Sequence, residues 1–269
     1  MNSCKNCGTS YEDGQLGMTK NKKLCLLWQN KTTRQWYHVG NLLYNEENHY
    51  YQFSYELEKK RRGLKEALEN GYQPHIAFQD LDKTYVSNKL FLPFARRVPN
   101  TNRPDYDAFL KKNGLTRNST TMEILKATGG RLATDNYEFV NPIIFDDKNI
   151  VYKVEFFARG WRYYEGQKLM EQRSWDLKPV DLTFKIDKEN PQDDCAVAIF
   201  IDNIKVGYVP AFYSAFFKDM IEKEQLFVVS DLSLDKNNIP QLRLLLKIQG
   251  HMTNGNTQKG FKEHFLLPV

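Results

Sequence analysis

A two-residue break between two apolar runs is the feature that most constrains the fold of this chain. Residues 196–201 and 204–209 are mostly aliphatic, and only Asp202 and Asn203 separate them. Asp and Asn tolerate the left-handed backbone of tight hairpin turns. The pattern therefore predicts an antiparallel hairpin. Pro210 then opens a predicted helix that runs to about residue 223.

Further strand-like runs surround this hairpin. They are rich in β-branched and aromatic residues, and polar breaks separate them. We predict strands at residues 151–158, 180–186, 226–234 and 241–248. The helix after Pro210 carries an apolar stripe at helical spacing, which indicates core packing. The stripe consists of Phe212, Phe216, Phe217 and Met220.

The first half of the chain predicts a second, smaller sheet with helices. Strand-like runs lie at residues 23–29, 36–43 and 50–55. Predicted helices lie at residues 57–70, at residues 104–112, and from the capping-box sequence at 120–123 to Gly129. The fold class is therefore α+β. We expect a polar tail (1–21), an α+β domain (22–148), a second domain with one or two helices (149–250) and a C-terminal extension (251–269).

Positive charge gathers in one segment of the first half. The net charge is +5, yet residues 149–269 carry 16 basic and 16 acidic residues. Residues 89–131 hold nine Lys or Arg against three Asp or Glu, and such clusters favour phosphate-bearing partners. A solvated helical face is the commoner origin of charge runs and stays an alternative. The candidates for contacting a nucleic-acid backbone are Arg96, Arg97, Arg103 and Arg131.

Several classes of protein are disfavoured. No run approaches the ~20 apolar residues that span a bilayer, and the N-terminus lacks the apolar run of a signal peptide. Four cysteines do not make a disulfide framework. We therefore expect a cytoplasmic protein with no membrane partner.

The sequence contains no recognisable catalytic set. It lacks a phosphate-binding glycine loop, a dinucleotide fingerprint and a zinc-protease helix, and its five histidines form no evident triad. Cys4 and Cys7 make half of a zinc ribbon, and Cys25 and His38 lack the spacing to complete it. We expect no enzymatic activity, no cofactor and no metal, unless two copies of the chain share the half-site.

Three short segments of the second half follow one another in a fixed order. They are Gly160–Tyr164, Asp187–Val197 and Val206–Pro210. Their order and spacing resemble the HIRAN family, which has a Gly-x-Arg-Tyr-Tyr segment, an Asn-Pro-x-Asp segment and a Gly-Tyr-hydrophobic-Pro segment. The resemblance implies a small β-barrel that captures the 3′ end of single-stranded DNA.

The resemblance also implies roles for individual residues. Arg162 would meet a backbone phosphate, for which its planar fork is suited. Tyr163 would stack on a terminal base, and Asn190 would bond to a base edge. Asp193 would accept a hydrogen bond from the terminal 3′-hydroxyl and repel a phosphate placed there. Tyr208, in the third segment, completes the set.

The same segments also have a purely structural interpretation. Gln192 stands where the family's end-binding member has a second aromatic residue, so a base would not lie between two rings. Asn190 and Asp193 fit a turn held by side-chain hydrogen bonds, and Gly207 fits a close approach of two chain segments. The aromatic residues of the first segment also fit a core or a subunit interface.

A weaker resemblance lies in the first half. Residues 26–29, 39–42 and 51–55 are similar to the opening subdomain of HipA-type toxin kinases. The chain is too short for a kinase lobe beside the HIRAN-like half, so a kinase would act only as a partner. Gly129-Gly130-Arg131 could hold a phosphate, but it more often forms a helix C-cap.

Two hypotheses follow. In the first, the chain is a non-enzymatic protein that binds single-stranded or damaged DNA ends in a bacterial defence or repair system, with a helicase as a candidate partner. In the second, it is an antitoxin-like interaction module that docks a kinase or regulator through its HipA-like half. An enzyme with an unrecognised site is a third.

Overall fold

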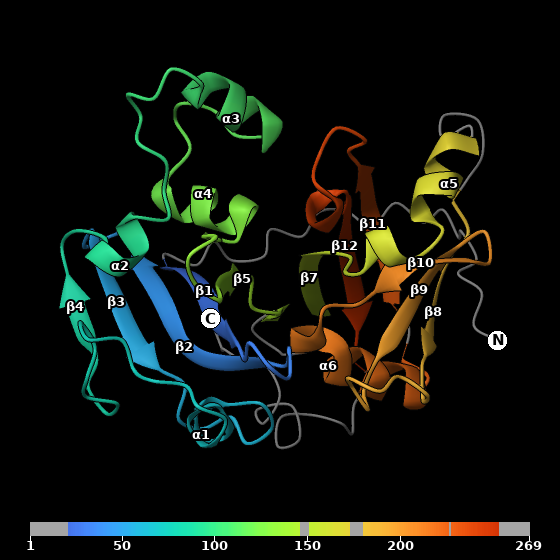
Figure 1. The fold of residues 1–269 in the computed structure, drawn as a ribbon, viewed down its shortest axis with the longest axis horizontal. Coiled ribbons are helices and arrows are strands. Elements are labelled where there is room, and N and C mark those ends of the chain that lie inside the picture. The colour runs from blue at the N-terminus through green and yellow to red at the C-terminus, as the bar shows by residue number, and fades with distance from the viewer. Residues whose placement is uncertain (1–20, 146–150, 173–179, 226, 253–269) are drawn as a thin grey trace. The chain divides into compact units, whose positions relative to one another are not determined.

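The computed structural model describes residues 21–145, 151–172, 180–225 and 227–252 (Figure 1). These residues form two compact units that divide between Pro142 and Ile143. The division comes a few residues before the predicted boundary at 148/149. The reason is that Ile144 and Phe145 already pair with Lys153 and Tyr152 of the second unit.

The N-terminal unit is a five-stranded antiparallel sheet with short helices. The sheet order is β4-β3-β2-β1-β5. Its strands are β1 (Asn21–Gln29), β2 (Trp36–Asn45), β3 (Tyr50–Tyr55), β4 (Tyr85–Ser87) and β5 (Tyr137–Val140). Its helices are α1 (Leu64–Glu69), α2 (Leu92–Ala95), α3 (Tyr106–Lys112) and α4 (Thr121–Thr128). Figure 1 shows β3, β2 and β1 side by side in this sheet.

Helix α4 begins and ends as its sequence indicates. Thr120 and Glu123 form a reciprocal capping box, and Gly129 ends the helix in the left-handed conformation with φ 67°. The predicted helix over residues 57–70 is wrong in its first half, because only Leu64–Glu69 is helical. Before it the chain folds back on itself, and a side chain at Gly63 would meet the carbonyl oxygen of Lys59 at 1.9 Å.

The C-terminal unit contains two antiparallel sheets, ordered β10-β9-β8 and β11-β12-β7-β6. The strands are β6 (Ile144–Phe145), β7 (Val151–Phe157), β8 (Leu182–Ile186), β9 (Val197–Ile201), β10 (Ile204–Tyr208), β11 (Phe227–Leu234) and β12 (Leu244–His251). The helices are η1 (Trp161–Tyr163), α5 (Gly166–Gln172), α6 (Ala211–Glu222) and η2 (Pro240–Leu242). The mixed helix-and-strand class is confirmed. The barrel stays a prediction, because the pairings among the described strands do not close one.

The hairpin and the helix after it form as predicted. Asp202 and Asn203 have φ of 49° and 63° and join β9 to β10. Helix α6 buries its aromatic stripe, with Phe216 against Tyr152 of β7 at 4.9 Å and Phe217 against Phe184 of β8 at 5.9 Å between ring centroids. The helix therefore packs against strands of both sheets, and the core interpretation of its stripe is confirmed.

No helix within the described residues is long and apolar enough to cross a membrane.

Candidate functional site

The segment after β7 forms a rigid base for two surface side chains. Gly160 turns the chain with φ 85°, a conformation that favours glycine. Trp161 is then buried at 1% exposure. Gly166 packs so closely on the indole that an added Cβ would lie 2.7 Å from ring carbons. The core interpretation therefore holds for Trp161, whose burial fixes the direction of the residues that follow it.

Arg162 and Tyr163 lie at the surface on this base. The Tyr163 side chain is 72% exposed, which is unusual for a large aromatic residue. The Arg162 guanidinium lies 4.8 Å from the centroid of the Tyr163 ring, within the range of a cation–π contact. A ring and a cation thus stand together in solvent, where a base and its phosphate could reach both.

A close backbone approach brings the third segment to the first. Arg159 and Tyr208 exchange two backbone hydrogen bonds, of 2.9 and 2.8 Å. A side chain at Gly207 would place a Cβ 2.4 Å from the carbonyl oxygen of Arg159. The residue must therefore be glycine for this pairing to form, which confirms the close-approach interpretation of Gly207.

A β-bulge sets the side chains of β10. The pairing with β9 shifts between Lys205 and Gly207, because Val206 is an extra residue. In a regular strand, residues three apart point to opposite faces. Here the bulge places Lys205 and Tyr208 together, with 2.6 Å between the Lys205 Nζ and the Tyr208 hydroxyl.

Lys205 and Tyr208 form a polar cluster with Asp187 and Tyr164. The Tyr208 hydroxyl donates to Asp187 Oδ2 at 2.6 Å, and Lys205 Nζ donates to the same oxygen at 3.0 Å. The Lys205 Nζ also lies 4.8 Å from the Tyr164 ring centroid. The Tyr164 and Tyr208 rings meet edge to face at 5.6 Å. The cluster ties η1 to the ends of β8 and β10.

The contacts within the cluster shift its pKa values. Hydrogen bonds from Tyr208 and Lys205 lower the pKa of Asp187. Partial burial opposes protonation of Lys205, but hydrogen bonds to Tyr208 and Asp187 outweigh it and raise its pKa. Burial, and then the hydrogen bond with Tyr208, raise the pKa of Tyr164 to about 12. At neutral pH the cluster therefore holds a charged Lys–Asp pair and a neutral Tyr164.

The turn between β8 and β9 begins at this cluster. Asn190 Oδ1 accepts hydrogen bonds from the backbone N–H groups of Gln192 and Asp193, at 2.9 and 3.1 Å. Asp193 is 9% exposed. Its Oδ1 accepts from the Cys195 N–H at 3.1 Å, and its Oδ2 accepts from the Ser214 hydroxyl at 2.7 Å. The turn is held as the structural interpretation expects, and the role of Asp193 at a 3′-hydroxyl stays a prediction.

Residues from all three motif segments thus meet around one end of the sheet β10-β9-β8. Tyr208 pairs with Arg159 next to η1, and the same Tyr208 bonds to Asp187, where the second segment begins. Sequence reasoning missed three members of the site: Lys205, Tyr164 in its contact with Tyr208, and Ser214. Gly207 within the strand is the sequence sign of the bulge that directs Lys205, and Ser214 lies on an otherwise apolar helix face.

Several arginines of the basic segment pair with carboxylates. Arg97 is 9% exposed and makes a bidentate pair with Asp135. Arg103 pairs with Asp105, and Arg131 pairs with Glu138 at 2.8 Å. Arg97 is therefore a structural residue, which corrects its assignment to a nucleic-acid surface. Arg131 belongs to an intramolecular pair beside the helix C-cap, and the phosphate-cradle interpretation of Gly129–Arg131 gains no support.

Arg96 differs from these arginines. Its guanidinium is exposed, and no described carboxylate pairs with it. The other three arginines predicted to contact a nucleic-acid backbone each pair with a described carboxylate.

Potential metal ligands gather at one place among the described residues. Side-chain atoms of Asp193, Asp194 and Cys195 lie within 4.8 Å of one another. Both oxygens of Asp193 already accept internal hydrogen bonds. Cys4 and Cys7 lie outside the described residues. Cys25 is buried in β1, and His38 Nε2 contacts the Gly40 carbonyl and Asn41 Oδ1, at 3.1 and 3.0 Å.

Comparisons with known proteins bear on the C-terminal unit. Searches of curated proteins and of solved structures give no match. A scan of family models matches residues 151–252 to the HIRAN domain. The match does not include the N-terminal unit, so its likeness to HipA-type kinases stays a prediction. The matched range holds all three motif segments and both sheets from β7 onward, and the C-terminal part of this chain is therefore a HIRAN domain.

Proposed function

We propose that the HIRAN domain of this chain binds single-stranded nucleic acid through Arg162 and Tyr163, at a strand end or a damaged site. The HIRAN match supports a nucleic-acid-binding role. The observation that carries the proposal is the 72% exposure of Tyr163 beside the Arg162 guanidinium, on a base fixed by buried Trp161. An exposed ring contributes little to folding, whereas stacking on a base is worth about 1–3 kcal/mol.

The surroundings suggest a contact with few phosphates. Lys205 is paired with Asp187, and Lys168 lies 3.4 Å from Glu165. Arg162 is thus the cation most directly placed beside Tyr163. Because affinity for a single strand falls with a slope of roughly 0.7 per neutralised phosphate in a log–log plot against salt, we expect a shallow slope, near one. A steep slope would indicate binding through residues 89–131 instead.

The role is binding rather than catalysis. This proposal rests on the HIRAN match and on the lack of a catalytic set in the sequence. A place in defence or repair, and docking on a kinase or helicase, rest on resemblance alone. A hydrophobic protein interface would show neither oligonucleotide binding nor the salt dependence described above.

The test is fluorescence anisotropy with labelled single strands that end in 3′-hydroxyl or 3′-phosphate, using the full chain. Tyr163→Ala should weaken binding about 5- to 150-fold, and Tyr163→Phe should retain it. Val228→Ala, on β11 of the same domain and 58% exposed, is the matched control and should bind as wild type does. Unchanged binding by Tyr163→Ala, or no binding by wild type, would refute the proposal.

The two strand ends test the finer statement. A preference for the 3′-hydroxyl that disappears in Asp193→Asn would place Asp193 at the strand end. Equal binding of both ends would restrict the proposal to single strands without end recognition.

A further inference from the structure

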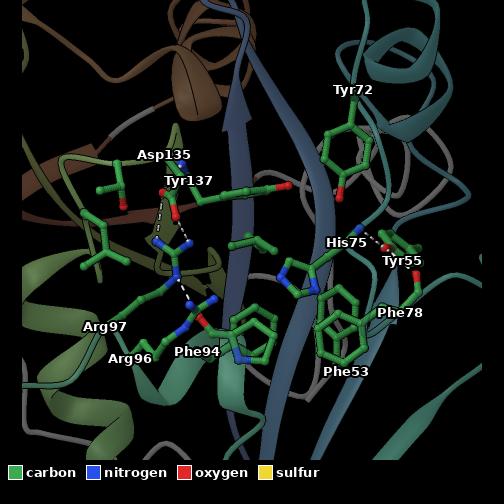
Figure 2. A pocket seen from close by; sticks show the side chains of 14 residues that line it. Phe53, Tyr55, Tyr72, His75, Phe78, Phe94, Arg96, Arg97, Asp135 and Tyr137 are labelled. Carbon is green, nitrogen blue, oxygen red and sulfur yellow. Dashed lines mark hydrogen bonds and ion pairs between the residues drawn. The ribbon is translucent and has the colours of Figure 1, made fainter.

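The N-terminal unit contains a cavity that the nucleic-acid proposal does not use. Its volume is about 480 Å³, within the range of about 300–1,000 Å³ common for small-molecule sites. Side chains from β1, β3, α2, β5 and the loops at residues 72–78 and 132–135 line it. Figure 2 shows the labelled side chains arranged around this one space.

Aromatic rings make the floor of the cavity. Phe53, Phe78 and Phe94 are buried at 1–4% exposure. Their rings pack against one another, with centroids 4.4 Å apart for Phe53 and Phe78 and 5.4 Å apart for Phe78 and Phe94. Such a floor gives the cavity an aromatic, apolar lining.

Two tyrosines and a histidine add a polar edge. Tyr72 and Tyr137 meet edge to face at 6.3 Å, and burial raises the pKa of both hydroxyls. Burial, followed by the charges of Arg96 and Arg97, lowers the pKa of His75. These side chains are therefore neutral near pH 7. They can exchange hydrogen bonds with a ligand without adding charge.

The charges that line the cavity leave one cation without a counter-charge. Arg97 is fully engaged, because it donates to the carbonyls of Pro93 and Gly130 and to both oxygens of Asp135. Arg96 also lines the cavity. Its exposed guanidinium has no carboxylate partner among the described residues. A neutral aromatic space with one unpaired guanidinium suits a ligand that is planar and carries an anion.

We propose that this cavity binds a planar aromatic ligand with an attached anionic group, with the ring above Phe53, Phe78 and Phe94 and the anion at Arg96. A nucleoside monophosphate and an aromatic carboxylate share this chemistry. The site is independent of Tyr163 and of the HIRAN domain.

Isothermal titration calorimetry on the full chain tests the proposal. The probes are adenosine monophosphate, adenosine, inorganic phosphate and indole-3-carboxylate. Either aromatic anion should bind, and adenosine and phosphate alone should bind at least about tenfold more weakly, because each lacks half of the recognised chemistry. Tighter binding of adenosine monophosphate would identify the ligand as a nucleoside monophosphate. Tighter binding of indole-3-carboxylate would identify it as an aromatic carboxylate.

Two variants probe the cavity from different sides. Arg96→Ala should weaken binding of the anionic probes about tenfold or more without affecting folding, since its side chain is exposed. Thr134→Trp, at an exposed position on the lining, should block entry of the ligand.

Arg117→Ala is the matched control. It removes an exposed arginine that pairs with Asp107 outside the cavity, so this variant should bind as wild type does. Failure of both aromatic anions to bind, or binding that survives Arg96→Ala and Thr134→Trp, would overturn the proposal.

Discussion

The Ser214 hydroxyl donates a hydrogen bond of 2.7 Å to Asp193 Oδ2, and this bond joins the turn before β9 to helix α6. Ser214 is fully buried and Asp193 is 9% exposed. A carboxylate in such a place is stable only when its oxygens are hydrogen-bonded. Asp193 therefore anchors the turn that carries Asn190, whatever it contributes to a bound strand.

Ser214→Ala should lower the free energy of unfolding by about 1–3 kcal/mol, because it leaves an oxygen of a nearly buried carboxylate without its partner. Urea unfolding followed by fluorescence would measure this. The double variant with Asp193→Ala should lose less than the sum of the two single losses, since both changes remove the same bond. Additive losses would show that the two side chains do not depend on each other.

Gly207→Ala should destabilise the HIRAN domain. Its Cβ would lie 2.4 Å from the backbone oxygen of Arg159, which has no room to move without breaking the Arg159–Tyr208 pair. Overpacking of this kind costs about 1–3 kcal/mol. We expect a lower Tm and faster amide exchange at Arg159 and Tyr208. A variant with wild-type exchange at both positions would contradict the role given to Gly207.

Arg97→Ala should lower the free energy of unfolding of the N-terminal unit far more than Arg117→Ala does. Arg97 has a side-chain exposure of 5%, and its loss would leave Asp135 and two backbone carbonyls without their donor. Breaking a buried pair in this way costs about 3–5 kcal/mol. Arg117 and Asp107 form an exposed pair, which is worth about 0–1 kcal/mol. Equal losses in urea unfolding would show that the burial of Arg97 does not matter.

The elements that local chemistry determines were predictable. The Asp202-Asn203 turn, the Thr120–Glu123 capping box and the aromatic stripe of α6 each depend on residues close together in the sequence. The prediction of a helix over residues 57–70 was wrong in its first half because it rested on helix propensity alone. In the structure the chain folds back before residue 64, and Gly63 packs against the backbone of Lys59. Propensity yields to such constraints.

The candidate site was predictable only in part for a similar reason. The motif order led to Arg162, Tyr163, Asn190, Asp193 and Tyr208. It could not reveal that the bulge at Val206 turns Lys205 toward Tyr208, or that Asp193 reaches Ser214 on a helix that begins 18 residues later. Nor did the charge count of residues 89–131 reveal the pairing of Arg97 and Arg131, because their partners Asp135 and Glu138 lie beyond that segment.

His38 should make the stability of the N-terminal unit depend on pH. Burial, and then the charge of Lys59, lower its pKa to about 3. The ring Nε2 lies 3.1 Å from the Gly40 carbonyl oxygen and 3.0 Å from Asn41 Oδ1. Both neighbours are acceptors, so Nε2 carries the hydrogen in the neutral ring.

The sign of the effect follows from proton linkage. Below an ordinary histidine pKa of about 6.5, the unfolded chain binds a proton at His38 that the folded chain does not. The free energy of unfolding should therefore fall as the pH drops from 7 to 5, by up to about 1.4 kcal/mol per pH unit for this one group. His38→Gln keeps an N–H donor but cannot titrate. Urea unfolding at several pH values should show that wild type loses free energy of unfolding relative to His38→Gln as the pH falls. A difference that stays constant from pH 7 to pH 5 would show that His38 is protonated equally in both states.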